Sequence, residues 1–285
     1  MLTFGERLAA AMTAHGPLCV GIDPHPQLLD AWGLTQDAGG LETFAMTCVE
    51  AFAGTAAVVK PQSAFFERFG SAGVAVLERT LAALRDSGTL SLLDVKRGDI
   101  GSTMEAYARA YLDDEAPLRA DAVTLSPYLG YGSLRPAVEL AAATGRGVFV
   151  LALTSNPDGP GVQHARLDGR SVAASVVEGV TRDNAGASPL GSVGMVVGAT
   201  VGDAAGRLGL ELAASRAPLL APGLGAQGAG AADLPGVFGA ALPQVLASSS
   251  RGILSAGPGV DALRQAVRDA AAPLVASRTG DSLGS

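Results

Sequence analysis

Short apolar segments alternate with amphipathic segments along nearly the whole of this 285-residue chain, and no other feature constrains the fold as much. The apolar segments are often rich in Val and Leu, as in parallel strands buried on both faces of a sheet. They lie near residues 18–23, 56–60, 90–95, 120–125, 147–153, 192–197, 217–221 and 244–248. Helical patterns lie between them near 38–54, 71–87, 102–113, 132–144, 168–184, 200–214 and 231–242, with a last one near 259–275. Eight such units predict an α/β fold, a closed (β/α)8 TIM barrel, with a doubly wound open sheet as the alternative.

Length and composition fit one domain of this kind. A TIM barrel typically needs about 250 residues, and a chain with 48% hydrophobic and 16% charged residues has ample material for a core. No linker interrupts the pattern, so we expect a single barrel domain over residues 1–275. A polar C-terminal tail, expected to be frayed, then covers residues 276–285.

The net charge, the two cysteines, the N-terminal residues and residues 217–250 argue against several classes of protein. The net charge of −7 disfavours nonspecific binding to nucleic acid or to an anionic membrane, so an anionic substrate needs a local basic site. Cys19 and Cys48 form neither a disulfide framework nor a metal-ligand spacing. The N-terminus lacks the apolar core of a signal peptide, and residues 217–250 are cut by Gly and Pro. The cytoplasm is therefore the expected location.

One short array concentrates charge at the end of an apolar segment. Residues 94–99 read Asp-Val-Lys-Arg-Gly-Asp, a D-x-K-x-x-D pattern. Side chains alternate along a strand, so Asp94 and Lys96 are expected on one side, with Asp99 in the loop beyond. Burying charge is costly unless the charges pair. The array therefore indicates either a structural ion pair or a site that uses its electric field.

Other polar residues follow the predicted strands at the same end. Asp23 follows the first strand, Lys60 the second, Thr154-Ser155-Asn156 the fifth, Gln227 the seventh and Arg251 the eighth. Barrel enzymes build their active sites at the C-terminal ends of their strands. The convergence of these residues on one rim predicts an active site there.

A glycine-rich segment, residues 221–230, follows the seventh predicted strand and contains Gly223, Gly225 and Gly228. A dinucleotide site is disfavoured, because no acidic residue follows at the expected distance. Glycines let backbone N–H groups approach an anion, and barrels commonly bind phosphate after strands 7 and 8. Arg251 offers the planar charged group that suits phosphate. A phosphate loop is the favoured interpretation, and a plain glycine turn is the alternative.

Together these residues resemble the orotidine 5′-phosphate decarboxylase family over nearly the whole barrel, from Gly21-Ile22-Asp23 to Arg251. The most specific parts are Asp94-x-Lys96-x-x-Asp99 with Ile100 and Thr103, and Pro222-Gly223-x-Gly225-x-Gln227-Gly228. Val59-Lys60-Pro61-Gln62 and Leu153-Thr154-Ser155-Asn156-Pro157 look like the longer bacterial branch, type 2. The resemblance implies a homodimer that converts orotidine 5′-monophosphate to UMP, the last step of de novo UMP synthesis, without a metal or another cofactor.

The resemblance also implies residue roles. Lys96 would donate the proton, Asp94 would face the substrate carboxylate, and Lys60 would bind ribose and pair with the carboxylates. Asp23 would bind ribose, and Ser155, with Thr154 as the alternative, would contact the pyrimidine. The other implied contacts are Gln227 and Arg251 at the phosphate, and Asp99 and Thr103 in the partner's site.

The residue types also suit this chemistry on general grounds. Loss of CO2 from C6 leaves electron density in the ring plane, where the π system cannot delocalise it, so a fixed cation must stabilise it. Two other functions stay open. A sugar-phosphate decarboxylase or aldolase of the same superfamily would use Mg²⁺, with an acid where Lys60 stands. A non-enzymatic nucleotide-binding barrel is the other.

Overall fold

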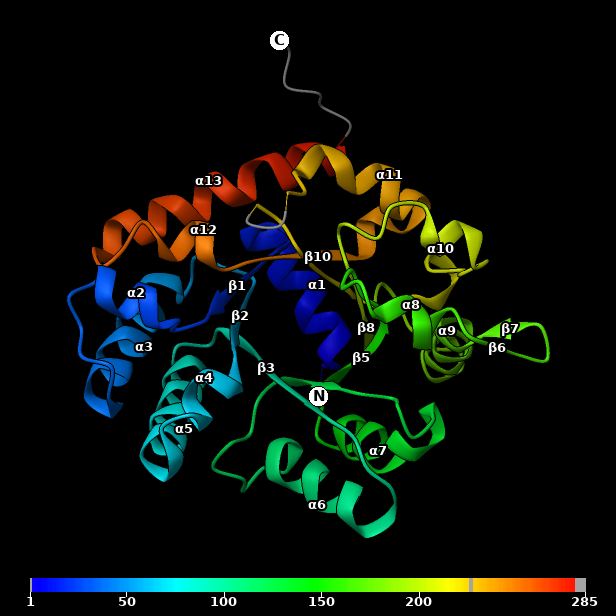
Figure 1. The fold of residues 1–285 in the computed structure, drawn as a ribbon, viewed down its shortest axis with the longest axis horizontal. Helices are drawn as coiled ribbons and strands as arrows, with labels where there is room; N and C mark the ends of the chain where they lie inside the picture. The colour runs from blue at the N-terminus through cyan, green and yellow to red at the C-terminus, as the bar shows by residue number, and fades with distance from the viewer. Residues whose placement is uncertain (1, 226–227, 280–285) are drawn as a thin grey trace.

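The computed structural model describes residues 2–225 and 228–279 and confirms the predicted barrel. Within these residues, eight parallel strands close in the order β1-β10-β9-β8-β5-β4-β3-β2. Their bounds are β1 Leu18–Ile22, β2 Val58–Pro61, β3 Leu90–Arg97, β4 Ala122–Leu125, β5 Gly147–Leu153, β8 Val193–Val197, β9 Leu219–Pro222 and β10 Val245–Ser249. Helices surround the strands (Figure 1). On one side lie α13 (Val260–Thr279) and α11 (Leu234–Phe238), and on the opposite side lie α6 (Gly101–Leu112) and α7 (Arg135–Ala143). The open sheet is thus excluded.

The longer outer helices lie where helices were predicted, although one of them begins later and another ends later than predicted. They are α3 Ala38–Phe52, α5 Gly70–Asp86, α6 Gly101–Leu112, α7 Arg135–Ala143, α9 Val172–Asp183 and α13 Val260–Thr279. Short elements flank them: α2 Pro26–Ala31, α4 Ser63–Glu67, α12 Arg251–Leu254 and the 3-10 turn η1 Tyr131–Leu134. The outward side chains of the strands and the inner faces of these helices form one continuous apolar core.

Three predicted helices differ from the structure. The helix predicted over 168–184 begins only at Val172, because residues 166–171 form a two-stranded antiparallel hairpin of β6 Arg166–Leu167 and β7 Arg170–Ser171. Asp168 and Gly169 connect these strands with φ of 51° and 80°. An Asp-Gly pair is the dipeptide that favours such a tight hairpin turn, so the signal was present in the sequence.

The other two predicted helices are broken into short turns. Residues 200–214 contain only α10 Ala204–Arg207 and η2 Ala213–Ser215, since Gly202 and Gly209 adopt positive φ. Residues 231–242 form η3 Ala231–Asp233, α11 Leu234–Phe238 and η4 Gly239–Gln244. Glycine and proline interrupt helices, so apolar periodicity alone overestimated these two.

Helix α1, Phe4–His15, was not predicted, and it closes the N-terminal end of the barrel. Its Thr3 and Glu6 form a reciprocal capping box, a sequence signal for a helix start. Phe4, Leu8 and Met12 pack with the inward side chains of the strands, and the Phe4 ring meets Phe149 edge-on. Figure 1 shows α1 within the ring of outer helices. The barrel is thereby sealed at one end only.

The inward positions of the strands change from apolar to polar toward the other end. Toward the N-terminal ends of the strands the inward residues are apolar, and they include Cys19, Val58, Leu92, Ala122, Leu220 and Leu246. Side chains on one face recur every second residue. Two positions further along the same strands, four of the six residues are polar, namely Lys60, Asp94, Thr124 and Ser248, and the other two are Gly21 and Pro222. The same alternation that fills the barrel therefore delivers polar groups to its C-terminal end.

The C-terminal helix is longer than predicted. Helix α13 runs to Thr279, so residues 276–279 are helical and do not belong to the polar tail, while residues 280–285 lie outside the described part of the chain. In the described residues, no helix is both long and apolar enough to cross a membrane.

Candidate active site

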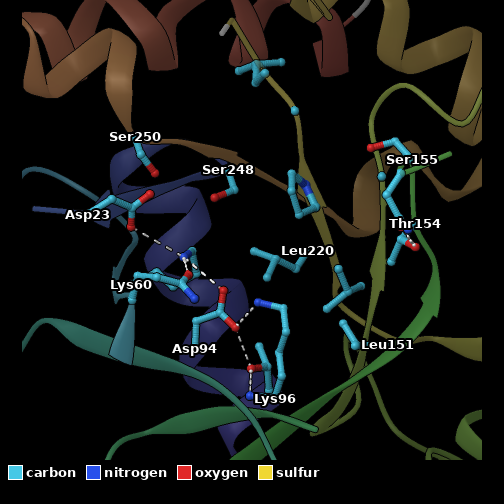
Figure 2. Close-up of a pocket in the computed structure, with 18 of the residues that line it drawn as sticks. Asp23, Lys60, Asp94, Lys96, Leu151, Thr154, Ser155, Leu220, Ser248 and Ser250 are labelled. Atoms are coloured by element: carbon cyan, nitrogen blue, oxygen red, sulfur yellow. Dashed lines mark hydrogen bonds and ion pairs between the residues drawn. The ribbon is translucent and has the colours of Figure 1, made fainter. Parts of the chain in front are cut away.

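A cavity of about 760 Å³ opens at the C-terminal ends of the strands. The predicted site residues that line it come from six strand ends: Asp23, Lys60, Asp94, Lys96, Ser155, Gly223 and Arg251. Figure 2 shows the charged side chains on one wall, with Thr154 and Ser155 across the cavity. The folded barrel therefore brings together residues separated by as many as 228 positions, from Asp23 to Arg251.

Lys60 is the buried centre of the charged wall. Its side chain is only 7% exposed, and its Nζ lies 3.2 Å from Asp94 Oδ2 and 3.9 Å from Asp23 Oδ1. It also donates a hydrogen bond of 3.0 Å to Gln62 Oε1. Gln62 was not predicted as a site residue, although it stands two residues after Lys60. The ammonium is thus held from three directions.

Lys60 and Asp94 stabilise each other's charged form. Burial lowers the pKa of Lys60, but Asp23 and Asp94 outweigh burial and raise it above its ordinary value. Burial raises the pKa of Asp94, but Lys60 and Lys96 outweigh it and leave the pKa below the ordinary value. Lys60 and Asp94 therefore both carry their charge at neutral pH.

Lys96 reaches from this cluster into the cavity. Its Nζ donates to Asp94 Oδ1 at 2.6 Å, so the side chains meet as predicted. Asp94 is 9% exposed at its side chain, but Lys96 is 47% exposed. The backbone of Lys96 has φ of 46°, in the left-handed region that residues other than glycine rarely adopt. An accessible ammonium is thus anchored by a buried carboxylate.

Asp23 carries an unused hydrogen-bonding atom. Among the described residues, its buried Oδ1 accepts no hydrogen bond. Ser248 and Ser250, at the end of β10, line the same part of the cavity (Figure 2). Neither serine was predicted, although their spacing of two places both on the inward face. This corner offers acceptors and hydroxyls to a polar ligand.

The wall formed by the segment after β5 is held by a residue that the sequence did not reveal. Gln163, at the end of helix α8 Gly159–Gln163, accepts from the Thr154 backbone N–H at 2.8 Å and donates to Thr154 Oγ1 at 2.6 Å. Thr154 Oγ1 in turn donates to Asn156 Oδ1 at 2.6 Å. The Thr154 proton is therefore engaged, whereas Ser155 is exposed toward the cavity.

The glycine loop adopts conformations that favour glycine. Gly223, Gly225 and Gly228 have φ of 110°, 76° and 92°, and Gly223 lines the cavity. Gln227 lies outside the described residues. Arg251 also lines the cavity, and in the described part of the chain its guanidinium forms no ion pair with a carboxylate. These features leave a cationic side chain and a glycine-rich backbone at one edge.

Asp99 and Thr103 do not line the cavity of their own chain. Within the described residues, Asp99 forms no ion pair with Lys96, and its Oδ1 accepts a hydrogen bond from the N–H of Ile100 at 2.8 Å. Thr103 is exposed on α6. The D-x-K-x-x-D array is therefore divided: its first two charges enter the cavity and its last one lies outside.

Comparison with known proteins identifies the family. The family model described as "Orotidine 5′-phosphate decarboxylase / HUMPS family" matches residues 16–266. The chain belongs to the orotidine 5′-phosphate decarboxylase family. A protein of that name from Salinispora tropica is 63% identical over 98% of this chain and 100% of its own length. One from Streptomyces coelicolor is 61% identical over 93% and 95%.

Solved structures extend the orotidine 5′-phosphate decarboxylase resemblance to three dimensions. A crystal structure of a Streptomyces avermitilis protein superposes with a TM-score of 0.94 at 58% identity, covering 98% of this chain and 97% of the other. The Leishmania donovani OMP decarboxylase superposes with a TM-score of 0.77 at 31% identity, covering 98% and 100%. The fold and the family therefore agree.

Proposed function

We propose that this protein decarboxylates orotidine 5′-monophosphate to UMP and CO2, the last step of UMP synthesis, with Lys96 as the proton donor. The observation that carries the proposal is the accessible Lys96 ammonium, anchored 2.6 Å from Asp94 at the rim of the cavity. Relatives covering nearly the whole chain bear the name of this enzyme. The cytoplasmic location stays a prediction.

The reaction needs a cation at a defined place. Breaking the bond from C6 to the carboxylate leaves an electron pair in the plane of the pyrimidine ring. A preorganised ammonium stabilises that charge as it develops, and then supplies the proton that replaces CO2. Lys96 can perform both steps, since Asp94 fixes its position without enclosing it.

Lys60 and Asp94 set the field around this centre. Lys60 neutralises Asp23 and Asp94 from inside the barrel, where side-chain exposure is 7%. The Asp94 carboxylate faces the part of the cavity where we place the substrate carboxylate. Closely placed like charges disfavour the bound substrate and are relieved when neutral CO2 leaves.

The remaining groups bind the nucleotide away from C6. Asp23 Oδ1, which accepts no hydrogen bond among the described residues, suits a ribose hydroxyl. Ser155 contacts the pyrimidine in preference to Thr154, whose hydroxyl proton is directed to Asn156. Arg251 and the loop of Gly223, Gly225 and Gly228, together with Gln227, bind the phosphate. Binding energy from the phosphate end serves to position C6.

The Mg²⁺-dependent alternative conflicts with the position of Lys60. Its ammonium lies between the carboxylates of Asp23 and Asp94, where a divalent cation would need to bind. A second cation there would meet electrostatic repulsion from Lys60. This placement favours the metal-independent reaction.

The decisive experiment is a spectrophotometric assay with orotidine 5′-monophosphate, with and without EDTA. We expect loss of orotate absorbance that EDTA does not affect and that Lys96→Ala abolishes. Asp203→Ala, a change in an exposed ion pair that does not line the cavity, is the control. Turnover that EDTA stops would instead support the Mg²⁺-dependent function, and binding of UMP without turnover would support a nucleotide-binding barrel.

We also propose a homodimer in which Asp99 and Thr103 complete the partner's site. An exposed apolar group beside them supports it: Ile100 is 61%, Tyr128 80% and Leu129 53% exposed. A hydrogen bond of 2.8 Å from the Ser126 N–H to the Arg97 carbonyl ties the two segments together. Exposed apolar side chains on two segments that meet at the end of β3 fit a second copy of the chain.

Mixing two inactive variants tests this arrangement. Asp99→Ala and Lys96→Ala are each expected to be inactive alone. If Asp99 acts in the partner's site, every mixed dimer has one site with neither change, and random mixing restores about one quarter of the activity. Mixtures that remain inactive although mixed dimers form would show that Asp99 acts within its own chain or not at all.

A further inference from the structure

Thr124 of β4 faces the one irregular stretch in the pairing of β3 with β4. Leu93 pairs with Val123 and Arg97 pairs with Leu125, so the three residues Asp94, Val95 and Lys96 face Thr124 alone. Thr124 is 1% exposed and lines the cavity. Threonine is common in strands, so no sequence pattern distinguishes Thr124.

The Thr124 hydroxyl contacts each of these three residues. Its oxygen accepts hydrogen bonds from the backbone N–H of Val95 at 3.0 Å and of Lys96 at 2.9 Å. Its single proton goes to Asp94 Oδ1 at 2.8 Å. A hydroxyl has one proton and two lone pairs, so its hydrogen-bonding capacity is full and each bond has a defined direction.

These bonds act on both ends of the Asp94–Lys96 pair. At the backbone, they hold Lys96 at φ of 46°, a conformation that needs support from its surroundings. At the side chain, they orient the same Asp94 oxygen that accepts from Lys96 Nζ at 2.6 Å. The bulge and the ion pair therefore share one anchor.

We propose that Thr124 is a positioning residue: its hydroxyl locks the bulge in β3 and aims the Asp94 carboxylate, so that the Lys96 ammonium stands at a fixed place in the cavity. Its effect on turnover rests on the proposed decarboxylase function. Its effect on Asp94 does not, and can be measured without substrate.

The charge state of Asp94 provides that second measurement. The charged groups that face it are Lys60 from β2 and Lys96 from its own strand, with Asp23 beyond Lys60; the buried Cys19 thiol of β1 is the other titratable neighbour. Burial raises the pKa of Asp94, the two lysines lower it, and the Thr124 hydrogen bond also lowers it. Removing the hydroxyl should therefore raise this pKa.

The test compares Thr124→Val, Thr124→Ser and the control Thr80→Val. Thr80 is also fully buried, but its hydroxyl bonds only to the Val76 carbonyl within α5. Because small misplacements near a reacting centre cost up to about 100-fold, we expect Thr124→Val to lower kcat about 10- to 100-fold with little change in KM. Thr124→Ser should stay within about threefold of wild type, and Thr80→Val should not change kcat.

The pH dependence gives the decisive sign. The acid limb of kcat should move to higher pH in Thr124→Val only. In urea unfolding, Asp94 contributes stability above its unfolded pKa that is lost as pH falls through its folded pKa. A raised folded pKa shrinks that loss, so Thr124→Val should lose less stability than wild type between about pH 7 and pH 3.

Wild-type kcat and an unmoved acid limb in Thr124→Val would overturn the proposal, as would a Thr124→Ser variant as impaired as Thr124→Val. If the valine variant does not fold, Thr124→Ala is measured in the same way. Absence of decarboxylation in the wild type would refute the proposed function instead, and the urea measurement would still decide whether Thr124 controls Asp94.

Discussion

Strands β3 and β4 carry similar polar groups at their two ends, and these do different work. At the N-terminal end, Asp121 Oδ2 accepts from the backbone N–H and the hydroxyl of Ser91, at 2.9 and 3.1 Å, and its other oxygen pairs with Arg7 of α1. At the C-terminal end, Asp94 accepts from Thr124 and pairs with Lys60 and Lys96. Each end thus combines one carboxylate, one hydroxyl and cationic side chains.

The difference lies in what remains unsatisfied. Arg7 also donates to the Gly145 carbonyl at 2.9 Å, so the network at the N-terminal end attaches α1 to the closed end of the barrel. The network at the C-terminal end faces a cavity and leaves Lys96 accessible, and beside it lies an Asp23 oxygen that accepts no hydrogen bond among the described residues. A network in which every polar group has its partner stabilises the fold, whereas a ligand-binding site needs polar groups that can still bond to the ligand. The comparison predicts separable effects of mutation at the two ends.

The largest effect is expected from Asp94→Asn. It removes the anchor of Lys96 and the charge that faces the substrate, so kcat should fall about 10³-fold or more. The variant should remain folded, as measured by circular dichroism. Activity close to wild type would mean that the network at the C-terminal end of the barrel is structural, like the one at the N-terminal end.

The reverse result is expected from Asp121→Ala. The change leaves the Ser91 N–H without its acceptor and removes the charged partner of Arg7. Unfolding in urea should show a loss of about 1–3 kcal/mol, since Arg7 and Asp121 are partly exposed. The value of kcat should be unchanged. A large fall in kcat with full stability would refute the division between the two ends.

The pH dependence of stability should also differ between wild type and Asp94→Asn. The folded pKa of Asp94 lies below its ordinary value, so its stabilising contribution is present above the unfolded pKa near 3.9 and is lost as pH falls through the folded pKa. Asp94→Asn should therefore lose less stability than wild type on acidification to about pH 3. Urea unfolding at a series of pH values measures this, and parallel curves for the two proteins would contradict it.

The smallest effect is expected where charges pair at the surface. Arg207 and Asp203 are 63% and 73% exposed at their side chains. Solvent screening leaves such pairs worth little, so Asp203→Ala should change unfolding free energy by less than about 0.5 kcal/mol and leave kcat unchanged. A loss as large as that of Asp121→Ala would show that burial does not set the ranking.

Periodicity and local signals predicted much of this molecule. The eight strands, the longer outer helices and the rim positions of Asp23, Lys60, Asp94 and Lys96 all follow from alternation along the chain. Two helices were predicted too long near Gly202, Gly209 and Gly239, and the hairpin at Asp168-Gly169 was missed. In each case the prediction gave more weight to apolar content than to the residues that favour turns. Those signals were local and could have been used.

Other features depend on contacts that no local pattern carries. The sequence by itself determined the barrel and the order of charges along its rim. The barrel follows from eight alternating strand and helix patterns, and the charges follow from their positions at the ends of the strands. Only the tertiary structure decided that Thr124, 30 residues from Asp94, closes the bulge in β3, and that Gln163 holds Thr154. It also placed Asp99 outside the cavity of its own chain. Such hydrogen bonds depend on which strands become neighbours and in what register, and register is set by packing of the whole barrel.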